Sequence, residues 1–422
     1  MKRSFADILQ DLDSSLARKL ARKLPSWSAA AAEIPSSLSL EQCSSEATAA
    51  YKAGLAGLLQ NRSRPWLRER EGPGRQAGRD SAQRVVLQQQ LPSPAGYTIL
   101  DLTGGLGVDS WAFAQVAERV VYYERDAALA AAAARNFERL GAANIELRCE
   151  TVSPRSELPE ADLIYADPAR RNAAGRKVFL LEDCTPDILT LLPLLLRKAP
   201  AVLLKLSPMA DLAMLADRLG PALREIHVVE LDGEVKEILC LLVRNDEPAE
   251  PKIIIALLTS GATIEFCFSE EREARARFAA ELRPGELLLE PCPALLKAGA
   301  FRLPCERWGL LKLAPSTHLY TGHIPEPLRP SSPFPTSASE VTGPETGLFK
   351  PWKVREVMPF GAASFKELRQ RYPRAELTAR NLPVGSEELR KRLGIAPGGD
   401  VHIFACSLAD GSAVLLVTES GR

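Results

Sequence analysis

One stretch, Tyr97 to Asp126, limits the fold of this 422-residue chain more than any other. Its sequence, YTILDLTGGLGVDSWAFAQVAERVVYYERD, begins as a short apolar run ending in Asp101 and continues as a glycine-rich turn, a segment with helical spacing and a second apolar run. This order predicts a strand, a tight turn, a helix and a second strand. Glycines let the backbone pass close to a ligand, and Glu124, after the second run, can accept both hydroxyls of a ribose. The stretch therefore predicts a site for a nucleoside cofactor.

The spacing of the turn indicates which nucleoside. A dinucleotide motif needs a third glycine at the start of the helix, where this chain has Ser110. Asp101 before the turn would repel a pyrophosphate but could hold a cationic amino-acid group. The pattern acid-x-Thr-Gly-Gly-x-Gly resembles motif I of class I S-adenosylmethionine (SAM) methyltransferases, with Thr103 in place of the first glycine. A glycine-rich turn that binds nothing and a dehydrogenase are the alternatives.

The segment from Tyr97 to Val243 alternates regularly between strand-like and helix-like patterns. This alternation predicts an α/β fold with a mostly parallel, Rossmann-like sheet, and Asp232-Gly233 predicts a closing hairpin. The third strand is expected to end near the adenine end of the cofactor. The candidate cofactor-binding residues are Asp101, Thr103, Gly104, Gly105, Gly107, Glu124, Arg125, Glu150 and Thr151.

The predicted fourth strand ends in Asp167-Pro168-Ala169-Arg170-Arg171. Class I methyltransferases that act on exocyclic amino groups carry Asp/Asn-Pro-Pro-aromatic here. The amine is neutral and its lone pair is delocalised, so oxygen acceptors for its N–H bonds can align the lone pair with the methyl group. Asp167, Pro168 and Arg170 are the candidate catalytic residues, and Arg170, Arg171 and Lys205 are candidates for substrate contacts. A pair of surface arginines after a turn is the alternative for Arg170 and Arg171.

Composition shifts divide the chain into five expected parts. These are a helical amino-terminal subdomain (1–90), a methyltransferase domain (91–248), a small α+β module (249–325), a Pro/Ser-rich linker (326–346) and a second α+β module (347–422). An arginine-rich segment at 61–84 could follow a phosphate backbone or be a solvated linker.

Bulk properties exclude several classes. Lys plus Arg number 53, as do Asp plus Glu, so the chain as a whole has no basic field that would announce nucleic acid. The eight cysteines include no C-x-x-C, and no metal site is expected. Neither a secretory signal nor a membrane span is recognisable, so we expect a cytoplasmic protein without membrane contact.

Several segments together resemble one family. They are LPSWSAAAAEIPSSLSLEQCSSEATAAYKA, DLTGGLGVDSWAFA, YADPARRN, EPCPALLKAGAF with THLYT, and ARNLPVGSEELRKRLGI. They are similar to bacterial, largely Bacteroidetes, class I SAM-dependent methyltransferases with a carboxy-terminal THUMP-like domain, related to RNA cap guanine-N2 methyltransferases. At positions 169 and 170 this chain has Ala and Arg, where the guanine-N2 enzymes carry Pro and Trp.

That resemblance has several implications. It implies a SAM cofactor, ferredoxin-like and THUMP-like modules, and methylation of an RNA, tRNA or rRNA, at a base amino nitrogen. The alternatives are a catalytically silent protein that binds SAM and RNA, and a methyltransferase acting on a protein or a small molecule.

Overall fold

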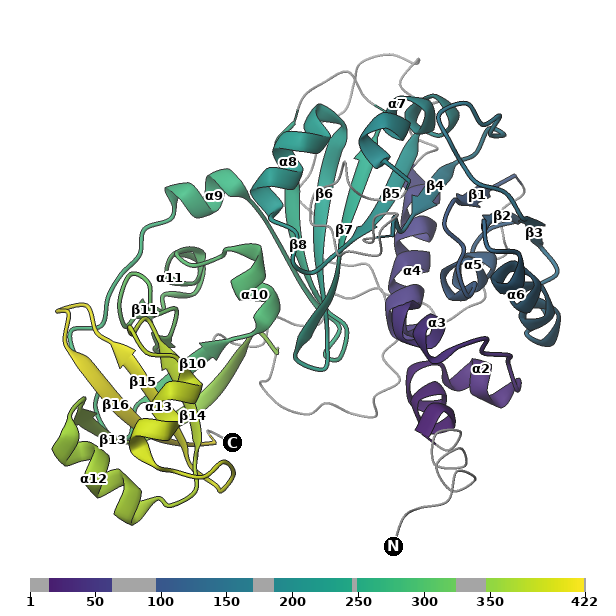
Figure 1. The fold of residues 1–422 in the computed structure, drawn as a ribbon. Helices are drawn as coiled ribbons and strands as arrows, with labels where there is room; N and C mark the ends of the chain where they lie inside the picture. Colours follow the sequence, from purple (N-terminus) through teal and green to yellow (C-terminus); the bar gives the residue numbers. More distant parts are fainter. Residues whose placement is uncertain (1–14, 63–95, 170–185, 245–248, 324–346, 421–422) are drawn as a thin grey trace, which may run out of the picture. The chain divides into compact units, whose positions relative to one another are not determined.

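The computed structural model describes residues 15–62, 96–169, 186–244, 249–323 and 347–420 (Figure 1). Several predicted features lie outside these ranges, namely Arg170, Arg171, the Pro/Ser-rich segment 326–346 and residues 63–84 of the arginine-rich segment. The chain divides into two compact units, one formed by residues 1–229, 236–251 and 332–335, the other by 230–235, 252–331 and 336–422. Within the described ranges, no helix has the length and apolarity needed to cross a membrane.

The first unit contains a Rossmann-like sheet. Seven of the strands in this sheet follow the hydrogen-bonded order β3-β2-β1-β4-β5-β7-β6. They are β1 (Thr98–Asp101), β2 (Arg119–Tyr123), β3 (Ile145–Arg148), β4 (Leu163–Ala166), β5 (Ala201–Leu206), β6 (Leu223–Leu231) and β7 (Glu234–Val243). The first five pair in parallel, and β7 runs antiparallel to β5. The predicted α/β fold with a closing hairpin is confirmed, and Asp232 and Gly233 have the positive φ values, 54° and 74°, of a tight hairpin turn.

Helices connect the parallel strands, as right-handed crossovers require. They are α5 (Val108–Ala114), α6 (Ala127–Arg139), α7 (Ile188–Lys198) and α8 (Leu212–Leu219), followed by the 3₁₀ turn η3 (Gly220–Ala222). The carboxylates of Asp126, Asp187 and Asp211 cap α6, α7 and α8 by accepting backbone N–H groups of the first turn. These caps fix where each strand-to-helix loop ends.

The amino-terminal helices α2 (Pro25–Ala29), α3 (Ser37–Gln42) and α4 (Glu46–Arg62) belong to the same unit as this sheet. The helix α4 packs against α5. Its Lys52 side chain is fully buried, and the Lys52 ammonium lies 3.1 Å from Asp109 on α5 and 2.8 Å from Glu237 on β7. The amino-terminal helices are therefore tied to the sheet through buried charges as well as apolar packing.

The second unit begins with a hairpin of β8 (Lys252–Leu257) and β9 (Ala262–Cys267) and the short helix α9 (Phe268–Glu273). A sheet follows whose described strands have the order β11-β12-β10-β13-β16-β15-β14. They are β10 (Leu287–Pro291), β11 (Leu311–Lys312), β12 (Tyr320–Thr321), β13 (Phe349–Pro359), β14 (Glu376–Arg380), β15 (His402–Ser407) and β16 (Ala413–Ser420). The helices are α10 (Pro293–Ala298), α11 (Leu303–Trp308), α12 (Ala362–Arg371) and α13 (Ser386–Leu393).

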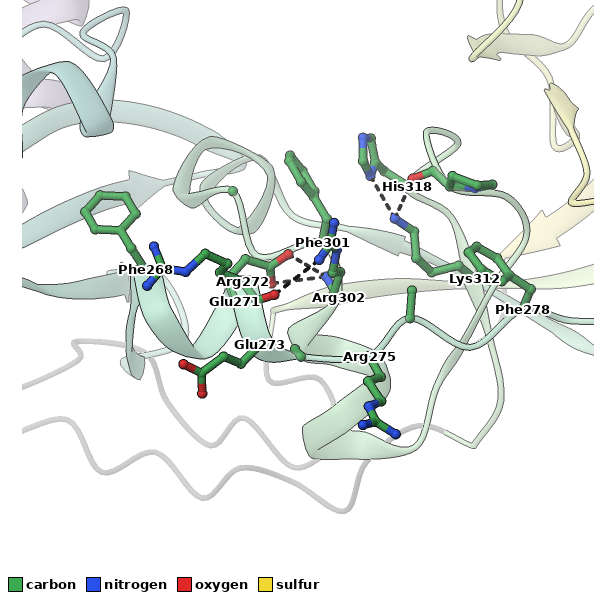
Figure 2. A pocket seen from close by; sticks show the side chains of 14 residues that line it. Phe268, Glu271, Arg272, Glu273, Arg275, Phe278, Phe301, Arg302, Lys312 and His318 are labelled. Atoms are coloured by element: carbon green, nitrogen blue, oxygen red, sulfur yellow. Dashed lines mark hydrogen bonds between the residues drawn. The ribbon is translucent and has the colours of Figure 1, made fainter.

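Two features of this unit bear on function. The strands β10 and β13 pair antiparallel, so the segments before and after the Pro/Ser-rich stretch share one sheet. A pocket of about 870 Å³ opens beside α9 (Figure 2). We call it the α9 pocket; it is lined by parts of α9, residues 274–276, Phe278 and parts of the segments 299–302 and 312–318.

Replacing Lys52 with Met tests the buried attachment of the amino-terminal helices. The variant leaves two carboxylates without their cation, so we expect the free energy of unfolding to fall by about 3 to 5 kcal/mol in urea denaturation. Lys19→Met is the matched control, because Lys19 pairs with Glu41 in an exposed ion pair and should change stability by less than about 1 kcal/mol. Equal losses for the two variants would contradict the assignment.

Candidate functional site

The carboxyl ends of the parallel strands form one edge of the sheet, and the chain delivers its strand-end acids there. Asp101 is the last residue of β1, Glu124 follows β2 and Asp167 follows β4. Asp101 is in register with Tyr122 on β2 and with Tyr165 on β4. Because β1 has one neighbour from each half of the fold, this edge is the point where strand order reverses, and α/β sheets bind ligands there.

The conformation of the glycine-rich loop between β1 and α5 is fixed by the aromatic side chains against which the loop packs. Gly105 and Gly107 have φ values of 56° and 93°, which favour glycine. A Cβ on Gly104 would overlap the ring of Tyr122, and one on Gly107 would overlap Phe137. The Tyr122 hydroxyl also donates to the carbonyl of Gly105 at 2.6 Å. The loop therefore lies directly on two aromatic rings, and side chains at these positions would lift it.

Asp101 is fully buried under this loop. Its carboxylate accepts the backbone N–H of Thr103 at 3.1 Å and the hydroxyl of Ser110 at 2.5 Å. Burial, reinforced by the nearby carboxylates of Asp109 and Asp167, raises the pKa of Asp101 to about 7 despite these bonds. Asp101 thus organises the loop and the start of α5, and its contact with a cationic ligand group stays a prediction.

Glu124 lies on the accessible side of the loop. Its two carboxylate oxygens accept the backbone N–H groups of Gly105 and Asp126, each at 2.9 Å. It is only partly buried, as a carboxylate that receives ribose hydroxyls must be. Arg125, Glu150 and Thr151 are exposed, and their side chains make no hydrogen bond to the loop within the described ranges. Their predicted role at the adenine end stays a prediction.

Asp167 connects the loop to the fourth strand. Its backbone N–H donates to the Thr103 hydroxyl at 2.6 Å, so threonine in the first-glycine position joins the two turns. Its Oδ2 lies 2.5 Å from the ammonium of Lys205 on β5. Burial disfavours the charged form of Lys205, but the carboxylates of Asp167, Glu237 and Asp109 outweigh burial and raise its pKa. Pro168 is buried, whereas Arg170 and Arg171 lie outside the described residues.

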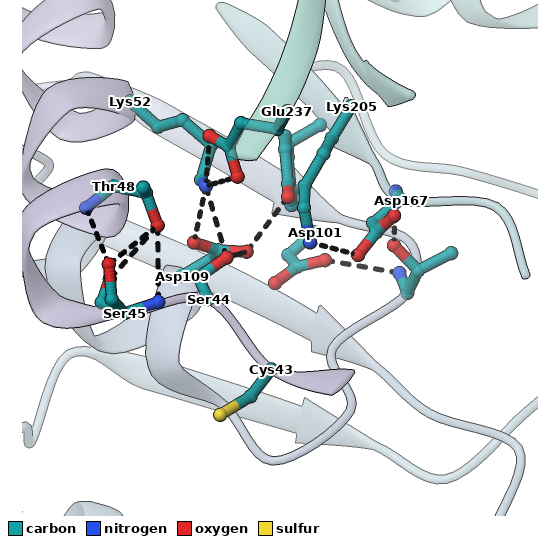
Figure 3. A network of polar contacts seen from close by, with 12 residues as sticks. Cys43, Ser44, Ser45, Thr48, Lys52, Asp101, Asp109, Asp167, Lys205 and Glu237 are labelled. Atoms are coloured by element: carbon teal, nitrogen blue, oxygen red, sulfur yellow. Dashed lines mark hydrogen bonds and ion pairs between the residues drawn. The ribbon is translucent and has the colours of Figure 1, made fainter. Parts of the chain in front are cut away.

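A second layer of buried charge supports this edge (Figure 3). Besides the ion pair with Lys52, the carboxylate of Asp109 accepts the hydroxyls of Ser44 at 2.9 Å and Tyr165 at 2.8 Å. Burial raises the pKa of Asp109, but Lys52 and Lys205 outweigh it, and the net shift is downward. For Glu237 burial outweighs both lysines, and its pKa is raised. The two carboxylates of this layer are therefore shifted in opposite directions although both contact Lys52.

Sequence reasoning missed this second layer. Lys52 stands alone among small apolar residues in AAYKAGLAG, and such an isolated charge in an apolar helix was the available signal. Its partners could not be read from the sequence, because Glu237 is 185 residues away. No group of His, Cys, Asp and Glu suited to a metal ion occurs within the described residues.

The residues at the edge fit SAM. The loop packs closely at the positions where a side chain would clash, a partly exposed carboxylate lies where the sequence predicts the ribose, and the neighbouring acids suit a positively charged sulfonium. Together with the strand order β3-β2-β1-β4-β5-β7-β6, these features define the fold of a class I methyltransferase.

Comparison with known structures identifies the family. A crystal structure of a "putative methyltransferase" from Porphyromonas gingivalis W83 is 30% identical with a TM-score of 0.73, and the match covers 97% of this chain and 89% of that one. The chain belongs to the family of that protein, which confirms the resemblance recognised in the sequence. Family models match residues 288–327 as a ferredoxin-like domain and 350–420 as a THUMP-like domain.

Other matches are more distant. An rRNA methylase from Streptococcus thermophilus is 13% identical with a TM-score of 0.27, over 35% of this chain and 86% of that one. A "putative methyltransferase" from Streptococcus mutans in complex with SAH is 12% identical with a TM-score of 0.28, over 35% and 88%. These scores carry no argument about function. No curated protein matches the chain.

Gly104→Ala tests the shape of the loop. The added methyl group would overlap Tyr122 and displace the loop, so we expect SAM affinity measured by calorimetry to fall at least about tenfold. Gly57→Ala is the control, because nothing lies within 4 Å of a Cβ there and alanine favours the helix α4. A Gly104→Ala variant that binds SAM like the wild type would show that the loop does not set the affinity.

The raised pKa of Asp101 predicts a pH dependence of stability. A carboxyl group with a raised pKa holds its proton more tightly in the native state, so it favours folding at low pH. This contribution is lost as the pH rises from the unfolded value of about 4 to the folded value of about 7. In urea titrations between pH 4 and 8, the stability of the wild type relative to Asp101→Asn should fall by up to about 4 kcal/mol. A difference that stays constant with pH would contradict the raised pKa.

Proposed function

We propose that this protein transfers a methyl group from SAM to an amino nitrogen on a base of an RNA, either a tRNA or an rRNA. One observation carries the proposal: the Asp167 N–H donates to Thr103, so the acceptor turn and the cofactor loop are held as one unit at one sheet edge. The THUMP-like match at residues 350–420 supports an RNA substrate, because THUMP domains are RNA-binding modules.

The loop and its flanking acids hold the cofactor. When bound, SAM supplies a methyl group on a positively charged sulfur that is a good leaving group. The glycines at 104, 105 and 107 present backbone to the methionine part, and Glu124 receives the ribose hydroxyls. Asp101 keeps Thr103 and Ser110 in place below. Arg125, Glu150 and Thr151 serve the adenine end.

Asp167 and Pro168 align the acceptor amine. Lys205 engages Oδ2 of Asp167, which leaves Oδ1 for an N–H of the amine, and the Pro168 carbonyl takes the second N–H. The carboxylates around Lys205 raise its pKa, so its ammonium stays protonated at neutral pH and holds Asp167 in place. Alignment by two acceptors suits a reaction whose leaving group is already activated. Arg170, Arg171 and Lys205 contact the substrate.

One observation favours a second candidate, a protein that binds SAM and RNA without catalysis. The Lys205 ammonium already occupies one oxygen of Asp167, and Ala169 and Arg170 replace the proline and aromatic residue of the amino-methylating pattern. Incubation of the protein with labelled SAM and total bacterial RNA separates the two. Label in RNA excludes the silent protein, and label in protein or small molecules alone would point to another substrate class.

Asp167→Ala tests the catalytic assignment. The variant removes the oriented acceptor but leaves the loop bonds of Thr103 and Glu124, so methyl transfer should fall about 100-fold or more while SAM affinity stays nearly unchanged. Asp217→Ala is the matched control, since Asp217 is an exposed acid on α8. Equal losses of transfer and SAM affinity would move Asp167 into the cofactor site. Mass spectrometry of nucleosides from a deletion strain and its parent would identify the methylated atom.

A further inference from the structure

The α9 pocket in the second unit contains a buried cation that forms no ion pair within the described ranges. Lys312 is 2% exposed, and its ammonium donates to the carbonyl of Pro315 at 2.7 Å and lies 3.4 Å from Nδ1 of His318 (Figure 2). It also faces the rings of Phe301 and Tyr320 at 5.8 and 6.0 Å. None of these groups carries a negative charge, and burial lowers the pKa of Lys312. A buried charge of this kind costs stability unless an anion neutralises it.

Three arginines line the same pocket. Arg272 and Arg275 are exposed, and within the described part of the chain their guanidinium groups have no carboxylate partner. Arg302 donates to the carbonyl of Arg272 at 3.2 Å. The lining also includes Glu271 and Glu273, but the oxygens of Glu271 accept the backbone N–H groups of Arg302 and Leu303. The pocket therefore has four cations against two carboxylates, which leaves an excess of positive charge.

Many arginines elsewhere in the second unit are paired, in contrast to those of the pocket. In the THUMP-like segment, many arginines are neutralised by glutamates. The pairs are Arg355 with Glu419, Arg371 with Glu356, Arg380 with Glu290, Arg390 with Glu376, and Arg392 with Glu388. These paired arginines add little to a field that attracts an anion, whereas the unpaired cations of the α9 pocket do.

Aromatic rings stand beside the cations. Phe278 is 41% exposed, unusual for a large apolar side chain, and it forms an isolated β-bridge with Lys312. The rings of Phe301 and His318 stack at 3.9 Å with an angle of 27°. His318 adopts a positive φ of 51°, a backbone conformation that non-glycine residues hold only under constraint. An accessible ring next to unneutralised ammonium and guanidinium groups matches a ligand with a flat base and a phosphate.

We propose that the α9 pocket binds an unpaired nucleotide of an RNA chain, with its phosphate at Lys312 and Arg302, the neighbouring phosphate of the chain at Arg272 and Arg275, and its base against Phe278. The pocket geometry alone supports a nucleotide. The choice of an RNA chain over a free nucleotide rests on the proposed function. The site lies entirely within the second unit. A base that is paired and stacked in a helix could not lie against Phe278, so the pocket should select unpaired nucleotides.

The test uses the full-length protein and fluorescein-labelled octauridine, which has no paired bases, in anisotropy titrations over a range of salt concentrations. Phe278→Ala and the double variant Arg272→Ala/Arg275→Ala should each weaken binding at least about fivefold. The double variant should also reduce the salt slope by about 0.7 for each phosphate that is no longer neutralised. Arg283→Ala is the matched control, because Arg283 is an exposed arginine outside the pocket that pairs with Glu281.

Lys312→Met separates binding from folding. If the ammonium serves a ligand, its removal should lower octauridine affinity while the melting temperature stays unchanged or rises, because an unneutralised buried charge is removed. A lower melting temperature with unchanged octauridine affinity would make Lys312 a structural residue and overturn its role in binding the phosphate. Pocket variants that bind octauridine with the affinity and salt slope of Arg283→Ala would overturn the proposal.

Two further measurements separate this inference from its rivals. Uridine monophosphate that binds the wild type as tightly as octauridine would assign the pocket to free nucleotides and overturn the RNA chain as ligand. Methyl transfer is measured in the same preparations with labelled SAM. If the wild type methylates no RNA but the pocket variants bind octauridine more weakly, the proposed function is refuted and the RNA site in the pocket is supported. If the wild type methylates RNA but the pocket variants bind octauridine normally, the proposed function is supported and the RNA site is refuted.

Discussion

The buried ammonium of Lys52 is the interaction on which the first unit depends. It joins three elements far apart in the chain, because α4 contributes the cation while α5 and β7 contribute Asp109 and Glu237. Asp109 in turn receives the hydroxyl of Tyr165, on the strand that leads to Asp167. The amino-terminal helices thereby help to set the electrostatics of the sheet edge, although they contribute none of the predicted cofactor ligands.

The two units handle buried lysine in opposite ways. Lys52 and Lys205 each face carboxylates within bonding distance, and their charge is used inside the fold. Lys312 is also buried, but among the described residues its ammonium contacts a carbonyl, an imidazole and aromatic rings, with no ion pair. Burying a charge without neutralising it is unfavourable. The ion pairs of Lys52 and Lys205 are therefore explained by stability alone, whereas an external anion would explain the burial of Lys312.

Much of the fold could be predicted because its signals are local. The run from Tyr97 to Asp126 has its strand, glycine turn and helix within 30 residues, and turn chemistry at Asp232-Gly233 marked the hairpin. The bond between the Asp167 N–H and the Thr103 hydroxyl could not be predicted, because it depends on the register of β1 and β4 across 64 residues. The internal bonds of Asp101 could not be predicted either: its two oxygens accept the Thr103 N–H and the Ser110 hydroxyl, while its contact with a ligand stays a prediction.

The pairing of β10 with β13 has a consequence for inheritance and engineering. The ferredoxin-like match ends at residue 327 and the THUMP-like match begins at 350, yet the backbone bonds between Leu287–Pro291 and Phe349–Lys353 cross that division. Cutting there would strip β13 of one neighbour and leave a long unsatisfied strand edge open to self-association. The ferredoxin-like and THUMP-like domains should therefore be exchanged together between relatives. Chimeric proteins should be joined before residue 287 rather than between residues 327 and 350.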